Sequence, residues 1–353
     1  MKLRMPEYFK EFHCIADKCS DNCCIGWEID IDNKTANIYS KISGDFGKKL
    51  QKSITSTSPK SFILDKDERC PFLNNKNLCE IFIHLGENYL CNICTEHPRY
   101  YEWFDGIKEG GIGLCCEEAA KIIISQNTKF TTYDTDISFE DAEEYDSNIY
   151  LYLYNSRNKI IEHLENTDLP FNSRIRNILW YTYKLQQNLD NKKFDNINIE
   201  YIKPDSNTYL KPILKHFLTL EQFDSNWHLY LKNCINLYNN TSNKIKEFED
   251  KNPEVFRYLQ NISIYFIWRY FLKSVFDLDI LSKVKLMAVS LAVIKVLFYC
   301  KWLETGKLSL VDCIIITKNY SKEIEYSEDN LLSLKNVFNY NADFSIEKLI
   351  QLF

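Results

Sequence analysis

Residues 281–305 read LSKVKLMAVSLAVIKVLFYCKWLET and contain one of the two most apolar runs in the chain, residues 284–300. Lys285 and Lys295 interrupt this run, which is also short for a membrane span. The other apolar run, residues 262–276, is shorter still and also carries basic residues. We therefore predict that both runs form buried helices in a mainly α protein.

Helical periodicity extends through most of the chain after Glu117, because apolar residues recur there at three- and four-residue spacing. No alternation of strands and helices, as a parallel sheet requires, is visible. Short strands are expected near residues 28–31 and 61–64. Further helices are predicted over residues 117–125, 145–166, 173–189, 210–220, 225–239, 253–276, 309–321 and 329–338.

Cysteine usage divides the chain into two chemically different regions. Ten of the 13 cysteines, together with most of the glycines, lie within residues 1–125, which favours loops wrapped around a metal over long regular elements. We predict a loop-rich, cysteine-rich metal-binding region over residues 1–125. An irregular, all-helical region is expected over residues 126–353, with a possible linker near residues 188–207.

Overall composition limits the classes of partner. With 353 residues and 45% hydrophobic content, the chain can bury one large core or two ordinary ones without cross-links. Its 43 basic and 49 acidic residues form no basic block, so neither nucleic acid nor a membrane is the expected partner. The opening residues, MKLRMPEYFKEF, lack a signal-peptide pattern, and the expected location is the cytoplasm.

The cysteines before residue 117 follow spacings that are typical of metal sites. They form Cys-x4-Cys-x3-Cys-Cys from Cys14, then two separate cysteines, a Cys-x2-Cys pair from Cys91 and a final Cys-Cys pair. Thiolates two to four residues apart can bind one ion together, which indicates a soft metal. Nine thiols are the predicted ligands: Cys14, Cys19, Cys23, Cys24, Cys70, Cys79, Cys91, Cys94 and Cys116.

Several alternatives remain open for this cysteine pattern. An iron–sulfur cluster, with 4Fe-4S favoured, and zinc both take four ligands, so the thiols could serve two centres or one centre with further cysteines around it. A disulfide framework requires an oxidising compartment, and a thioredoxin-like motif requires a flanking βαβ unit. His13, His84 and His97 are further possible ligands. Cys234, Cys300 and Cys313 are interpreted as small buried hydrophobic residues.

In order and spacing, the N-terminal segments resemble the bacterial flagellin lysine-N-methylase family. The helical region resembles the family more weakly, through residues 261–271 and 320–334. In this comparison Cys115 is an extra thiol and Glu117 replaces a proline. The resembling N-terminal segments are residues 12–14 (FHC), 19–27 (CSDNCCIGW), 70–73 (CPFL), 78–79, 85–87 (LGE), 90–99 (LCNICTEHPR) and 114–121.

The resemblance implies N-methylation of surface lysines on flagellin, with S-adenosylmethionine as the methyl donor. The Cys-x3-Cys-x2-Cys motif of radical-type adenosylmethionine enzymes is missing, as are a Walker loop, a serine nucleophile elbow and a Gly-rich dinucleotide turn. The same cysteine layout also resembles cysteine-cluster proteins of unknown activity. The alternative function is therefore a non-catalytic, metal-stapled module that binds a protein partner.

Lysine methylation requires a neutral amine, which a nearby carboxylate or desolvation could provide. Among the residues that the resemblance covers, Glu87, Glu96 and Glu118 are candidate bases, and Arg99 could bind a carboxylate. Each of these could equally have a structural role. The aromatic residues Trp27, Tyr100, Tyr101 and Trp103 could form a cage around a lysine or simply pack over a metal loop.

Overall fold

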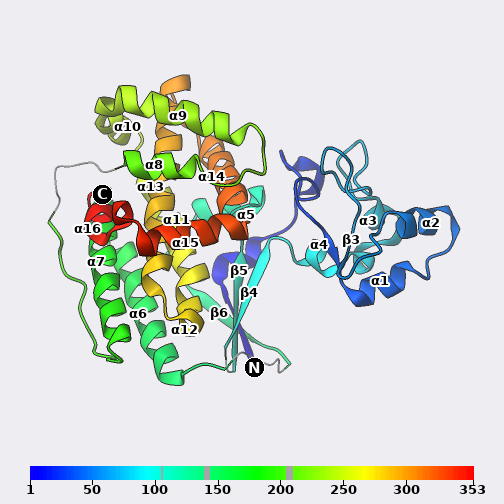
Figure 1. The fold of residues 1–353 in the computed structure, drawn as a ribbon, viewed down its shortest axis with the longest axis horizontal. Helices are drawn as coiled ribbons and strands as arrows, with labels where there is room; N and C mark the ends of the chain where they lie inside the picture. Colours follow the sequence, from blue (N-terminus) through cyan, green and yellow to red (C-terminus); the bar gives the residue numbers. More distant parts are fainter. Residues whose placement is uncertain (105, 139–143, 204–209) are drawn as a thin grey trace. The chain divides into compact units, whose positions relative to one another are not determined.

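The computed structural model describes residues 1–104, 106–138, 144–203 and 210–353. The described chain forms two compact units, which Figure 1 shows. The helical unit comprises residues 1–11, 101–115 and 119–353, and the cysteine unit comprises residues 12–100 and 116–118. The first residues and residues 101–115 thus group with the helices, although they lie within the predicted cysteine-rich region.

Helix α13 (Ile280–Thr305) runs through the core of the helical unit and is buried on nearly all sides. Asp279 caps its start by accepting a hydrogen bond from the Ser282 backbone, and Gly306 ends it with a positive φ of 73°. A helix that is apolar all round requires neighbours on every side. Those neighbours are α7 (Phe171–Asp190), α9 (Trp227–Thr241), α11 (Val255–Tyr270), α14 (Leu310–Ile324) and α15 (Glu328–Tyr340).

The remaining helices confirm that the protein is mainly α. The predicted helix over residues 253–276 is divided into α11, η5 and α12, and the predicted linker overlaps the end of α7. The part of that linker beyond residue 203 lies outside the described residues. The other helical elements of this unit are η1 (Glu7–Glu11), α5 (Glu117–Ile124), α6 (Ser147–Glu165), α8 (Lys211–Phe217), η4 (Ser242–Lys244), α10 (Ile245–Lys251), η5 (Phe271–Lys273), α12 (Ser274–Asp277), η6 (Ala342–Phe344) and α16 (Ile346–Ile350).

A four-stranded sheet, absent from the sequence prediction, belongs mainly to the helical unit. Its order is β4 (Arg99–Phe104), β5 (Ile107–Ile112), β1 (Lys2–Pro6) and β6 (Thr132–Asp136). Strand β1 is parallel to β5 and antiparallel to β6. Because its partners lie about 100 residues away in the sequence, β1 carries no local signal of this pairing.

The cysteine unit is built around a small aromatic core that includes Tyr39, Phe62 and Phe72. The rings of Phe62 and Phe72 meet edge to face, with centroids 5.2 Å apart. Short strands form near both expected places and pair antiparallel, although the second strand overlaps the expected range 61–64 only at Ser61. The elements are η2 (Ala16–Lys18), β2 (Asp30–Ile31), α1 (Asn33–Tyr39), α2 (Gly44–Lys52), β3 (Lys60–Ser61), α3 (Glu80–Leu85), η3 (Glu87–Tyr89) and α4 (Asn92–Glu96).

Within the described parts of the chain, no helix is both long enough and apolar enough to cross a membrane.

Candidate functional site

Six of the nine predicted ligand thiols gather in the cysteine unit. Cys79 is the N-cap of α3, Cys91 is the N-cap of α4, and Cys94 lies one turn further along α4. The Sγ atoms of Cys91 and Cys94 are 3.3 Å apart. Cys24 and Cys70 are joined through the backbone, where the Cys70 N–H donates to the Cys24 carbonyl over 2.9 Å. The cluster thus draws on three stretches of chain that are distant in sequence.

Burial and neighbouring thiols together shift the pKa values of these cysteines. A hydrogen bond with Cys23, burial, and the nearby thiols of Cys70 and Cys79 raise the pKa of Cys24. Burial raises the pKa of Cys70 to about 11. The hydrogen bond with Cys91, burial and the neighbouring Cys24 raise the pKa of Cys94. Such thiols lose their protons most readily to a bound cation.

Among the described residues, no disulfide joins two cysteines. Among the residues that the structure describes, no three or more His, Cys, Asp or Glu side chains converge as ligands of one metal ion. The six thiols have the donor chemistry of a soft-metal site, and their proximity fits such a site. Assembly of that site requires the sulfur atoms to converge further.

The other three predicted ligands have different surroundings. Cys19 Sγ lies 3.7 Å from the Glu117 carboxylate, which also accepts a 2.8 Å hydrogen bond from the Ser20 backbone. Cys116 directly precedes Glu117 in the chain, so Glu117 brings Cys19 and Cys116 into one neighbourhood. Cys14 is exposed. Apart from its replacement of a proline, Glu117 carries no signal in the sequence that singles it out.

The remaining cysteines are buried, whereas His13 and His84 are exposed. Cys234 and Cys300 are buried in the helical unit, where Cys300 Sγ donates to the Cys234 carbonyl over 3.2 Å. Cys313 is buried as well. His97 packs against Trp27, with ring centroids 5.4 Å apart, and His84 packs against Phe46 at 4.8 Å.

The candidate bases are distributed over separate elements. Glu87 begins η3 and is exposed, Glu96 ends α4 and is exposed, and Glu118 is half-buried in the first turn of α5. Arg99 donates a 3.0 Å hydrogen bond to the Thr95 carbonyl and lies over the Phe12 ring. Its guanidinium group thus helps to close the end of α4.

Two of the four aromatic residues predicted to form a lysine cage, Tyr101 and Trp103, do contact a lysine side chain. That lysine is Lys108 of the same chain. The Nζ atom of Lys108 on β5 lies 4.6 Å from the Tyr101 ring centroid and 4.5 Å from that of Trp103. Both rings belong to β4, two residues apart and therefore on one face of the strand. Trp27 packs against His97 instead.

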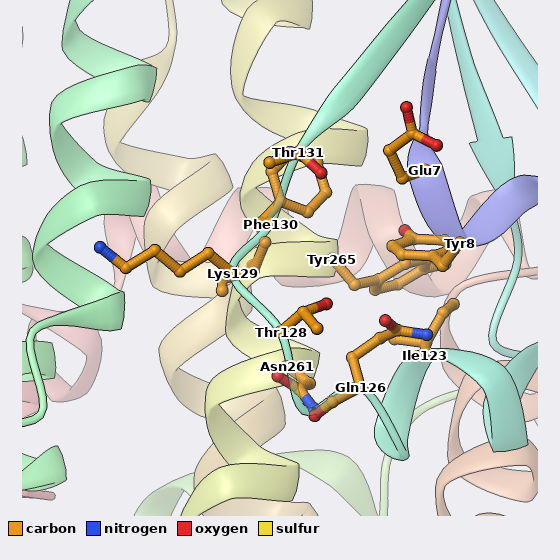
Figure 2. A pocket seen from close by; sticks show the side chains of 11 residues that line it. Glu7, Tyr8, Ile123, Gln126, Thr128, Lys129, Phe130, Thr131, Asn261 and Tyr265 are labelled. Carbon is orange, nitrogen blue, oxygen red and sulfur yellow. The ribbon is translucent and has the colours of Figure 1, made fainter.

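A small pocket in the helical unit, which sequence reasoning did not find, has a volume of about 40 Å³. Tyr8, Phe130 and Tyr265 supply its aromatic walls (Figure 2). Tyr8 is only 7% exposed, yet its hydroxyl has no hydrogen-bond partner among the described residues. Burial raises the pKa of this hydroxyl, so it stays protonated. The other lining residues are Glu7, Ile123, Gln126, Thr128, Lys129, Thr131, Asn261 and Ile264.

A buried polar network lies behind the Tyr265 wall of this pocket. The hydroxyls of Tyr265 and Tyr270 each donate a 2.9 Å hydrogen bond to Oε2 of Glu325, and Arg269 Nη1 lies 3.5 Å from the same atom. Glu325 is 4% exposed. The Leu114 backbone N–H also reaches the Tyr265 hydroxyl. This network fixes the orientation of the Tyr265 ring.

Comparison with known proteins assigns residues 112–352 to a family model described as the FliB lysine N-methylase C-terminal domain. The flagellar biosynthetic protein FliU of Salmonella muenchen is 25% identical over 34% of this chain and 75% of its own length. The lysine-N-methylases of Salmonella typhimurium and Salmonella choleraesuis are each 24% identical over 34% of this chain. The matched segment spans 32% of each lysine-N-methylase. No solved structure matches. The family model thus covers the helical region, whereas the resemblance seen in the sequence is strongest before residue 122.

Proposed function

The chain belongs to the family of the FliB lysine N-methylase C-terminal domain, and on that premise we propose that it is a protein-lysine N-methyltransferase acting on flagellin. The observation that carries this proposal is the extent of the family match, residues 112–352, which includes nearly all of the helical unit. The names of the relatives, a flagellar biosynthetic protein and lysine-N-methylases, support flagellin lysines as the acceptor.

In the proposed reaction the lone pair of a neutral lysine Nζ attacks the methyl carbon of S-adenosylmethionine. The N–C bond forms as the C–S bond breaks, the sulfonium leaves as a neutral thioether, and the methylated nitrogen then loses a proton. The protein must therefore bind the lysine in its uncharged form, because an ammonium group has no lone pair to donate.

The proposal also includes a cysteine-ligated metal centre in the cysteine unit, an iron–sulfur cluster or zinc. Cys23, Cys24, Cys70, Cys79, Cys91 and Cys94 would hold it, since their thiols already gather in one cluster. When bound, the metal would tie together loops that have only a small core of their own. Glu117 would position the separate pair formed by Cys19 and Cys116.

Co-expression with flagellin tests the proposal directly. Peptide mass spectrometry should find flagellin lysines that carry added methyl groups with the wild-type chain, and these should be lost with Cys24→Ser. Cys300→Ser is the matched control, because this thiol is buried in the helical unit and should leave methylation unchanged. Unmodified flagellin in the presence of metal-loaded protein and the methyl donor would instead favour the protein-binding module.

A further inference from the structure

We infer that the pocket around Tyr8 receives the end of a lysine side chain, and that it is the methyl-acceptor site. The acceptor role rests on the proposed function, whereas the binding of a primary amine can be tested independently of it. It begins from Tyr8, a residue that lines the pocket and whose buried hydroxyl has no partner among the described residues. A buried polar group without a hydrogen bond is costly, so a ligand that provides one is stabilised.

The size of the pocket selects the ligand. A volume of about 40 Å³ holds roughly three groups the size of a water molecule. The last two carbons and the nitrogen of a lysine side chain meet that limit. A nucleoside is far larger, so the adenosyl part of a methyl donor must bind elsewhere.

The lining of the pocket also matches a lysine side chain. The aromatic rings of Tyr8, Phe130 and Tyr265 and the aliphatic residues Ile123 and Ile264 provide apolar walls for methylenes. Aromatic faces also accommodate a methylated amine, because the ring quadrupole attracts its positive charge.

The interior of the pocket is uncharged, which favours the neutral amine that methyl transfer requires. The charged lining residues, Glu7 and Lys129, are exposed. Glu7 forms a 2.6 Å ion pair with Lys10, and Figure 2 shows the Lys129 side chain turned away from Tyr8. An amine that leaves water for such surroundings is favoured in its neutral form. An N–H of the neutral amine can then donate a hydrogen bond to the Tyr8 hydroxyl oxygen, which holds the nitrogen in place and leaves its lone pair free to attack.

Tyr265 keeps the pocket open and rigid. Its hydroxyl is held by Glu325, and Asn261 on the same helix donates 2.9 Å hydrogen bonds to the carbonyls of Ile124 and Gln126. These contacts fix the loop at residue 126 against α11. The site is therefore preorganised on elements of the family-matched region, with Tyr8 added from η1.

The first test measures binding of n-butylamine to the purified full chain by saturation-transfer NMR. Wild-type protein should bind the amine, Tyr8→Phe should bind it about tenfold more weakly, and Thr128→Trp, which fills the pocket, should not bind it. Tyr133→Phe on β6 is the matched control, since Tyr133 lies outside the pocket. Folding should not confound the comparison, because Tyr8→Phe loses no hydrogen bond to any residue that the structure describes. If wild type and both pocket variants bind n-butylamine equally, the amine does not occupy the pocket, and the inference is overturned.

Flagellin methylation then separates the two claims. If Tyr8→Phe and Thr128→Trp slow methylation while Tyr133→Phe does not, the acceptor assignment is supported. Methylation at an unchanged rate in both pocket variants would overturn it. Amine binding that depends on Tyr8, with flagellin left unmodified by the wild-type protein, would overturn the proposed function and support the pocket as an amine site.

Discussion

The hydroxyl of Tyr265 donates a 2.9 Å hydrogen bond to Oε2 of Glu325, across 60 residues of sequence. The two residues belong to the two helical segments, 261–271 and 320–334, through which the C-terminal region resembles the methylase family. The sequence contains both segments but does not indicate that they meet. Through this contact, the Tyr265 wall of the pocket and the buried Glu325 carboxylate hold each other in position.

Removing the Tyr265 hydroxyl should destabilise the protein. Tyr265→Phe leaves the Leu114 N–H without this acceptor and takes one donor from the buried Glu325 carboxylate. Leaving buried polar groups unsatisfied costs about 1–3 kcal/mol, which urea denaturation can resolve. Tyr340→Phe is the control because Tyr340 is 87% exposed. An equal, negligible effect of both substitutions would show that the network contributes little.

The ion pair between Glu109 on β5 and Arg157 on α6 should be essential for attaching the sheet to the helices. Arg157 is fully buried, and its guanidinium donates two hydrogen bonds of 2.5 and 2.8 Å to the carboxylate. Glu109→Ala leaves the buried cation without this partner and should cost about 3–5 kcal/mol. The double variant Glu109→Leu with Arg157→Met should lose much less stability, and a loss as large as that of Glu109→Ala would contradict this account.

The helices could be predicted because their signal is local. The apolar run of residues 284–300, with few charges and no breaker, indicated the buried helix α13 directly. The sheet could not be predicted in the same way, since β4 (RYYEWF) and β5 (IKEGGI) lack a regular apolar alternation. Their stability depends on pairing with neighbouring strands and on the Glu109–Arg157 ion pair.

Whether a functional residue could be predicted also depended on whether its signal is local in the sequence. Cysteine spacing pointed to the thiol cluster, because closely spaced cysteines are visible in the sequence. Tyr8 gave no such signal, since a single tyrosine near the start of a chain has no pattern around it. Only the fold brings it to the pocket formed by the loop at residue 126 and helix α11.

The stability of the protein should fall as the pH drops through the range in which histidine titrates. Burial and the nearby Arg174 lower the pKa of His163 below its ordinary value of 6.5, and burial also lowers the pKa of His216. The unfolded chain therefore takes up these protons first. The contribution to stability is complete above pH 6.5 and is lost as the pH falls toward the folded-state pKa.

Urea denaturation at about pH 7.5 and about pH 5.5 measures this loss. His163→Gln should reduce it, because the variant cannot bind the proton and keeps an amide near Asn177, which lies 3.3 Å from the His163 ring. His84→Gln is the control, since His84 is exposed. A pH dependence that is the same in wild type and His163→Gln would exclude His163 as its source.

The last prediction concerns the metal. Protein purified without oxygen should be brown, because charge transfer from thiolate to iron absorbs visible light, and Cys24→Ser or Cys94→Ser should lose the iron. Both thiols belong to the gathered six, and metal binding at such a site is coupled to folding of the surrounding loops. Cys234→Ser and Cys300→Ser should keep their iron, since these residues are buried in the helical unit. Elemental analysis of the four variants tests the assignment. If the protein is colourless, contains stoichiometric zinc and loses it in the first two variants only, the metal is zinc and the thiol site stands. Equal metal loss in all four variants would show that the cysteines are assigned wrongly.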